Sequence, residues 1–152
     1  MLDAEFRKLI KESREVEYQI MLWFKENVDP KSRMAIPKTK EFDIICHKVN
    51  NVEVKQDKLA AKTGNYALEI EDRFGQTSGL ALTTAGRFVI VDDEYVLIFD
   101  TTSLLFVIKD CDERRIIPMG ETDKQNRRGM GYLIPRRTLL NSPYVNLIKR
   151  WF

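Results

Sequence analysis

The sequence predicts an α/β fold in which a mixed β-sheet is flanked by helices. Two patterns favour this class. Apolar residues recur at steps of three and four along one long N-terminal run, which is typical of an amphipathic helix. Short apolar and β-branched runs then alternate with turn-forming and helical segments over the rest of the chain, an order typical of layered α/β domains.

The N-terminal run predicts a long helix over residues 2–28. It ends at Asp29-Pro30, because proline lacks an amide donor and restricts the residue before it. Residues 30–40 are polar, basic and interrupted by proline, so they predict a loop.

The elements after this loop are short. Strands are predicted over residues 42–46, 51–55 and 66–70, a loop over 72–79, and a short helix around 79–86. The second half predicts a hairpin of residues 88–91 and 95–99 across Asp92-Asp93-Glu94, a helix over 103–109 capped by Thr101 or Thr102, and a last strand over 132–134.

Length and composition limit the class of protein. The chain has 152 residues, 43% of them hydrophobic, which predicts one domain over residues 1–152 with a substantial core. Two cysteines cannot frame a disulfide scaffold, so a reducing compartment is favoured. No apolar run is long enough to span a bilayer, and the charged N-terminus lacks a signal-peptide pattern. We therefore expect a cytoplasmic protein without a membrane partner.

Charge is distributed unevenly along the sequence. Residues 114–152 contain nine Lys or Arg against Glu121 and Asp123, whereas residues 1–113 contain 16 basic and 21 acidic residues. A basic segment of this kind favours a surface for a polyanion such as DNA, and a solvated basic tail is the alternative.

The candidate site lies in the stretch from Asp43 to Lys55. Side chains two residues apart share one face of a strand, so Glu53 and Lys55 point the same way while Val52 and Val54 point into the core. If a three-residue loop, Lys48-Val49-Asn50, joins two antiparallel strands, Asp43 faces Lys55 and is a diagonal neighbour of Glu53. A two-residue turn at Asn50-Asn51 would instead place Asp43 opposite Lys58 and separate the group.

These residue types suit phosphodiester hydrolysis. Two carboxylates on one face can bind Mg²⁺ or Mn²⁺ through oxygen, with waters and a phosphate oxygen completing the shell. Lys55 would stabilise charge on the phosphate or help to activate the attacking water. The sequence therefore predicts catalytic roles for Asp43, Glu53 and Lys55, with Mg²⁺ or Mn²⁺ as the cofactor.

The spacing of Asp43, nine residues and then Glu53-Val54-Lys55 resembles the PD-(D/E)XK nuclease motif, with Phe42 in place of the proline. The sequence that follows resembles a phage-type branch of Holliday-junction-resolvase-like nucleases, through Asp57-Lys58, Lys62-Thr63-Gly64-Asn65, Leu68-Glu69, Ser78-Gly79 and Thr83-Thr84-Ala85. The resemblance implies a restriction-endonuclease-like αβββαβ core over about residues 1–110, followed by a basic C-terminal extension over about 111–152.

The resemblance also implies a further acidic residue on the first helix. Glu17 falls within the core-facing stripe, and Glu15 falls on the opposite side, so Glu17 is the candidate for a catalytic and metal-binding role. The alternative is a border residue or an ion pair with Lys40 or Lys55.

The implied function is metal-dependent cleavage of branched DNA by a homodimer in recombination, with a phage origin. Two alternatives remain: another PD-(D/E)XK enzyme, such as an exonuclease or a nicking or restriction-type endonuclease, or a non-catalytic DNA-binding or phage structural module. The predicted DNA contacts are Lys58, Lys62, Asn65, Ser78, Thr83, Arg127, Arg128, Arg136 and Arg137. For these residues the alternative to DNA contact is an ordinary structural role, such as a solvated face, a turn or a helix cap.

Overall fold

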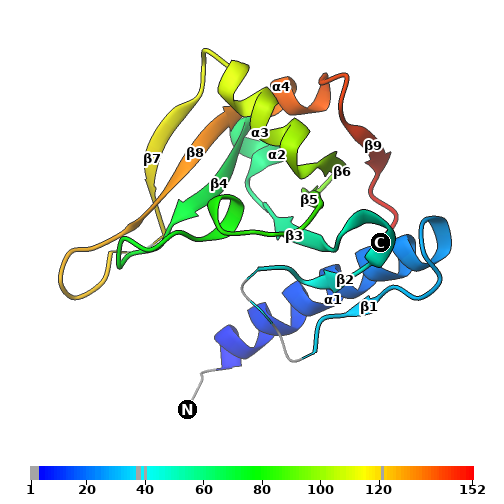
Figure 1. The fold of residues 1–152 in the computed structure, drawn as a ribbon. Coiled ribbons are helices and arrows are strands. Elements are labelled where there is room, and N and C mark those ends of the chain that lie inside the picture. The colour runs from blue at the N-terminus through cyan, green and yellow to red at the C-terminus, as the bar shows by residue number, and fades with distance from the viewer. Residues whose placement is uncertain (1–3, 37–38, 40, 121) are drawn as a thin grey trace.

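The structure, a computed structural model, describes residues 4–36, 39, 41–120 and 122–152. Its strands form two sheets (Figure 1). The larger sheet has the order β1-β2-β3-β5-β6-β9, and the smaller has the order β4-β8-β7. Because β3 pairs with β5 in parallel and the other neighbours pair antiparallel, the larger sheet is mixed and the predicted α/β class is confirmed.

The elements have the following bounds. The larger sheet contains β1 Arg33–Met34, β2 Ile44–Ile45, β3 Val52–Gln56, β5 Arg87–Val91, β6 Tyr95–Asp100 and β9 Asn146–Lys149, and the smaller contains β4 Asn65–Glu71, β7 Arg115–Met119 and β8 Gly129–Pro135. The helices are α1 Ala4–Asn27, α2 Ala60–Thr63, α3 Thr101–Asp110 and α4 Arg136–Leu140, with 3₁₀ turns η1 His47–Val49 and η2 Gly79–Ala81.

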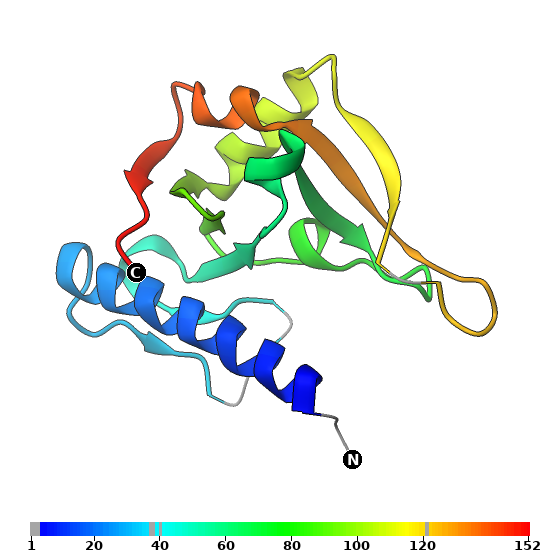
Figure 2. The ribbon, with the colours of Figure 1, turned by 180° about the vertical axis from the view of Figure 1, so that it is seen from behind.

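Helix α1 covers one face of the larger sheet (Figures 1 and 2). Its buried residues Val16, Ile20 and Phe24 pack with apolar side chains of β2, β3, β5 and β6. The predicted helix is confirmed over its described part, and it ends where the amides of Val28 and Asp29 both donate to the carbonyl of Phe24. Strand β1 lies within the segment predicted as a loop, and a two-residue strand leaves almost no periodic pattern.

The opposite face of the larger sheet packs against α3 and the smaller sheet. Phe88, Phe99, Leu104, Ile134 and other buried residues form this second core. Helix α3 starts two residues earlier than expected, and its cap is Asp100, whose carboxylate accepts from the amides of Thr102 and Ser103. The predicted threonine cap is therefore wrong; the Thr101 hydroxyl instead donates to the carbonyl of Ala85.

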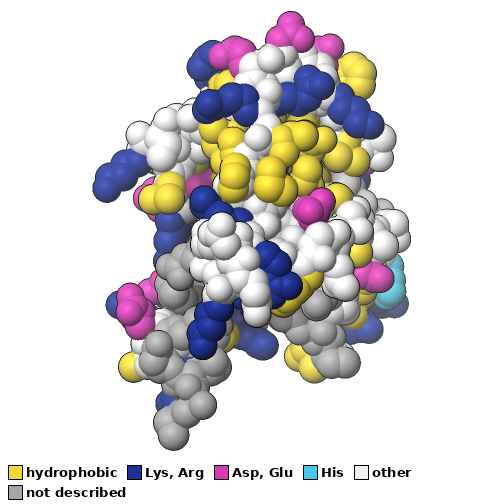
Figure 3. Space-filling view, turned by 90° about the vertical axis from the view of Figure 1, so that its left-hand side faces the viewer, with side chains coloured by type: hydrophobic (Ala, Val, Ile, Leu, Met, Phe, Trp, Pro, Cys, Tyr) yellow, Lys and Arg dark blue, Asp and Glu magenta, His cyan; other side chains and the backbone are white. Residues whose placement is uncertain are grey.

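The C-terminal segment contributes strands to both sheets. β8 pairs with β4, and β9 pairs with β6, so residues after 110 complete the layers that earlier residues begin. Phe152 packs into the core under α1, and both ribbon views place the C-terminus beside this helix. On the side where β7 lies, hydrophobic side chains gather below a row of Lys and Arg (Figure 3), and Ile116 of β7 is 60% exposed.

No described helix combines the length and hydropathy that crossing a bilayer requires.

Candidate metal and nucleic-acid site

A groove of about 910 Å³ brings together side chains from distant parts of the sequence. Glu17 of α1, Asp43 before β2, and Glu53 and Lys55 of β3 all line it. The far wall comes from β4 and the chain that follows it, including Glu69, Asp72, Ser78 and Gly79. The four predicted catalytic residues therefore share one groove.

Asp43 is fixed to the neighbouring strand by its own carboxylate. The amide of Val54 donates to Asp43 Oδ2 at 2.8 Å, and the amide of Asp43 donates to the carbonyl of Val52 at 2.9 Å. Asp43 is 7% exposed, so this bond to β3 is formed largely out of water. The backbone of β3 thus orients one of the candidate ligands.

The strand register keeps Asp43 on the face of Glu53, although it differs from the expected register by two residues. Ile44 pairs with Val52. Because the strands are antiparallel, the preceding residue, Asp43, lies opposite Glu53 rather than Lys55. The predicted three-residue loop is wrong because η1 lengthens the connection, and Asn50 and Asn51 close it with φ of 58° and 69°. A shift of two residues preserves the face, since side chains alternate with a period of two.

Strand β3 alternates as predicted. Val52 and Val54 are 0% and 9% exposed and pack beneath α1, whereas Glu53 and Lys55 are half-buried and line the groove on the other side. Within the described part of the chain, the ammonium of Lys55 makes no ion pair. It therefore supplies a positive charge to a groove whose other charged lining residues are acidic.

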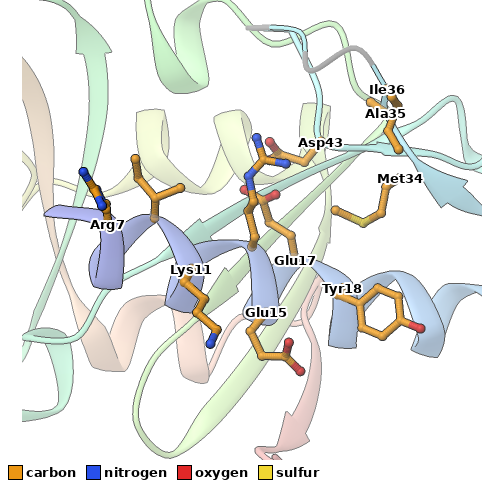
Figure 4. Close-up of a pocket in the computed structure, with 11 residues that line it drawn as sticks. Arg7, Lys11, Glu15, Glu17, Tyr18, Met34, Ala35, Ile36 and Asp43 are labelled. Atoms are coloured by element: carbon orange, nitrogen blue, oxygen red, sulfur yellow. The ribbon is translucent and has the colours of Figure 1, made fainter. Parts of the chain in front are cut away.

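Glu17 reaches the site from α1. It is 6% exposed and, with Asp43, lines both the main groove and a smaller pocket of about 500 Å³. Figure 4 shows its side chain rising from the helix toward Asp43, whereas Glu15 points away. Of the two glutamates considered, Glu17 is the one beside Asp43; Lys40, a suggested ion-pair partner, lies outside the described residues.

The donor set of the groove suits a hard divalent cation. Five carboxylates line it, Glu17, Asp43, Glu53, Glu69 and Asp72, and Lys55 is the one Lys or Arg among the described lining residues. No three His, Cys, Asp or Glu side chains in the described ranges meet as a preformed metal cluster. Mg²⁺ commonly takes only one or two protein carboxylates and completes its shell with water and substrate oxygens. Asp43 and Glu53 therefore fit such an ion.

The far wall of the groove is held close to the site by tight backbone packing. Gly79 has φ of 51°, and a Cβ atom there would collide with the carbonyl oxygen of Glu69. Ser78 begins η2 without capping it, and its buried hydroxyl has no hydrogen-bond partner among the described residues. Ser78 lines the groove, although its hydroxyl oxygen is itself buried.

The other predicted DNA contacts lie outside the groove lining. Lys58 pairs with Glu12 at 2.7 Å, and this ammonium lowers the pKa of the Glu12 carboxyl. Lys62 is exposed at the end of α2, and the Asn65 amide group donates to Thr63 in the same turn. The Thr83 hydroxyl donates to the carbonyl of Glu41, so it joins two backbone segments.

The four predicted arginines fall into two groups. Arg127 and Arg128 are exposed on the β7–β8 loop, and Arg137 forms an exposed pair with Glu113. Arg136 instead binds Asp92, which is fully buried, at 2.9 Å. Its guanidinium is engaged within the fold, which removes Arg136 from the candidate DNA contacts.

Asp92 is the centre of a buried polar cluster. Tyr66 donates its hydroxyl to Asp92 at 2.6 Å, and Arg136 donates from the other side. Burial works to raise the pKa of the Asp92 carboxyl, but these hydrogen bonds hold it below its usual value. Burial and the adjacent carboxylate together raise the pKa of Tyr66. The cluster ties β4, the β5–β6 turn and α4 together.

Searches with this chain against protein-family models, curated proteins and solved structures gave no match.

Proposed function

We propose that this protein is a metal-dependent DNA nuclease of the PD-(D/E)XK type. The observation that carries the proposal is the shared groove, which Glu17, Asp43, Glu53 and Lys55 all line although they come from a helix, a strand start and a second strand. The spacing of these residues in the sequence is common in charged proteins. Their position along one groove is more specific, because it depends on the strand register.

The order of the elements supports the same class. Helix α1 precedes three consecutive strands that pair antiparallel, and β5 then pairs with β3 in parallel. The αβββαβ order that the resemblance implies begins with the same helix and three strands. Between β3 and β5 the chain also supplies α2 and β4, and β4 belongs to the smaller sheet.

In this proposal Asp43 and Glu53 bind Mg²⁺ or Mn²⁺, with Glu17 beside them. When bound, the cation acts as a Lewis acid toward the scissile phosphate. The amide of Val54 holds the Asp43 carboxylate in place, so that ligand needs little rearrangement. Lys55 places its ammonium on the same face, where it stabilises negative charge developing on the phosphate and orients the attacking water.

Cleavage assays on DNA with and without Mg²⁺ test the proposal. We expect Asp43→Asn and Glu53→Gln each to reduce cleavage at least about a hundredfold, because each removes a charged ligand and keeps a similar shape. Glu71→Gln is the matched control, since Glu71 is an exposed strand carboxylate outside the groove lining. If metal-dependent cleavage survives both substitutions, the site is assigned wrongly.

The narrower proposal is an endonuclease for branched DNA that acts as a homodimer. A panel of linear, nicked, flapped and four-way DNA tests the substrate, and light scattering of the protein with four-way DNA tests the dimer. Equal cleavage of all four DNAs would favour a general nuclease. Binding without cleavage under any metal condition would favour a non-catalytic DNA-binding module.

A further inference from the structure

An exposed aromatic ring stands at the tip of the β4–η2 connection. Phe74 is 56% exposed, although the turn that carries it is well braced. Asp72 Oδ1 accepts from the amides of Phe74 and Gln76 at 2.9 and 3.0 Å, and a bridge between Glu71 and Thr77 closes the turn. The ring is therefore exposed to solvent on a turn whose backbone is fixed by hydrogen bonds.

A second braced loop meets this tip. In the β7–β8 loop, Asp123 accepts from the amides of Gln125 and Arg127 and from Arg127 Nε. The hydrogen bonds from Arg127 keep the pKa of the Asp123 carboxyl below its usual value, and the bond from the Arg127 backbone amide has the larger effect. Both ribbon views place the two loops side by side.

Two guanidinium groups stack on the ring. The Cζ atoms of Arg127 and Arg73 lie 4.8 and 5.0 Å from the Phe74 centroid. Arg73 has no hydrogen-bond acceptor among the described residues, so its N–H groups remain available to a ligand. Cations held against an aromatic ring are ordered in advance, which lowers the entropy lost when they bind a phosphate.

The tip stands at the end of the candidate site. Asp72, Gln76, Thr77 and Ser78 of the same turn line the groove, and Phe74 projects from the turn between them. A nucleic-acid strand that leaves the groove along this wall would meet the ring and the two arginines.

We propose that Phe74, with Arg73 and Arg127, is a stacking site for unpaired nucleotides of the DNA substrate. The proposal rests on the nuclease function and names its substrate class: DNA with an unpaired or splayed nucleotide next to the groove. Aromatic rings and guanidinium planes bind the open face of an unstacked base, and arginine binds the adjacent phosphate. The bases of an intact duplex offer no such face, because their neighbours already cover them.

The test is equilibrium binding of the full chain without divalent cation, so that cleavage does not interfere. One probe is a duplex with a short gap that contains unpaired 2-aminopurine, and the other is the fully paired duplex of the same sequence. We expect Phe74→Ala to weaken binding of the gapped probe by about 5- to 150-fold and to abolish the fluorescence quenching that stacking causes. Binding of the paired duplex should change less than about twofold.

Two variants serve as controls. Phe74→Trp keeps a stacking surface and should retain the quenching. Phe106→Ala removes a phenylalanine of nearly equal exposure, 57%, from α3, and should leave both probes unaffected. If Phe74→Ala leaves binding of the gapped probe unchanged, or weakens both probes equally, the stacking site is wrong.

The same panel separates this proposal from the nuclease function. If cleavage requires Asp43 and Glu53 while Phe74→Ala binds gapped DNA normally, the stacking site fails and the nuclease stands. If the chain cleaves no DNA but quenches 2-aminopurine through Phe74, the nuclease fails and the stacking site stands. Failure of the unaltered chain to bind the gapped probe overturns the stacking site directly.

Discussion

The side chain of Asp43 both accepts a hydrogen bond from the backbone and belongs to the candidate site. One of its carboxylate oxygens, Oδ2, accepts from the buried amide of Val54, and the residue also lines the groove. The sequence predicted that Asp43, Glu53 and Lys55 share a face, because strand parity follows from the spacing of residues. It did not predict the bond to Val54, which forms because β2 begins only after Asp43.

The two roles of Asp43 separate in different variants. Asp43→Asn keeps an oxygen for the Val54 amide, so we expect nearly unchanged stability and lost cleavage. Asp43→Ala leaves that amide unsatisfied and should lower the free energy of unfolding by about 1–3 kcal/mol. Urea denaturation of both variants measures the difference; equal stability would show that the hydrogen bond contributes nothing.

The Asp92 cluster gives a second prediction at this scale. Arg136→Ala leaves a fully buried carboxylate without its cation, and we expect a loss of about 3–5 kcal/mol in the free energy of unfolding. Arg137→Ala is the matched control, since its pair with Glu113 is exposed on both sides and should contribute at most about 0.5 kcal/mol. Similar losses in both variants would contradict the structural role of Arg136.

The same cluster predicts a dependence of stability on pH. The folded pKa of Asp92 is depressed, so its contribution is present above the unfolded value of about 3.9 and is lost as the pH falls through the lower folded value. Acid titration of unfolding should therefore show a decline in this range that weakens in Arg136→Ala. An unchanged acid profile in that variant would exclude Asp92 as a source of the decline.

At the scale of elements, the close approach of η2 to β4 shapes the wall of the groove. Long periodic elements were predictable: α1, β3, β4 and the β5–β6 hairpin all appear near their expected residues. Shorter ones were not, since β1 has two residues and β7 carries a proline within an exposed run. The wall itself depends on Gly79, and the sequence could not predict its close approach to the backbone of Glu69.

Two glycines test this wall. Gly79→Ala combines a positive φ with a collision against the Glu69 backbone, and we expect it to destabilise the fold and reduce cleavage. Gly75→Ala has a similarly positive φ, 76°, but its new Cβ would lie 3.9 Å from a flexible Glu71 oxygen. It should lose only about 1–2 kcal/mol, the cost of the left-handed conformation. Thermal denaturation and cleavage rates compare the two, and equal effects would remove the packing argument.

For the whole molecule, the C-terminal strand completes the larger sheet. β9 covers the edge of β6, and Ile148 and Phe152 pack against the core under α1. The sequence predicted a basic extension here but no strand after residue 134, because four residues with one half-buried side chain give a weak pattern.

Truncation before Asn146 tests this contribution. We expect a lower melting temperature and a tendency to associate, because the edge of β6 and apolar core residues become exposed. Trp151→Ala removes an exposed aromatic from the same segment and should change little. Melting temperature and size-exclusion chromatography measure both, and a truncated chain that remains as stable as the control would show that β9 is dispensable.

The carboxylate-rich groove also constrains the order in which ligands can arrive. Five acidic side chains and one lysine lie along its described walls, so a bound cation would lower the electrostatic cost of bringing a phosphodiester close to them. If the groove is a nuclease site, we therefore expect compulsory-order kinetics in which metal loading precedes productive DNA docking. The basic loops outside the groove would meanwhile bind the DNA backbone. Initial DNA binding and docking of the phosphate in the groove would then be separate steps.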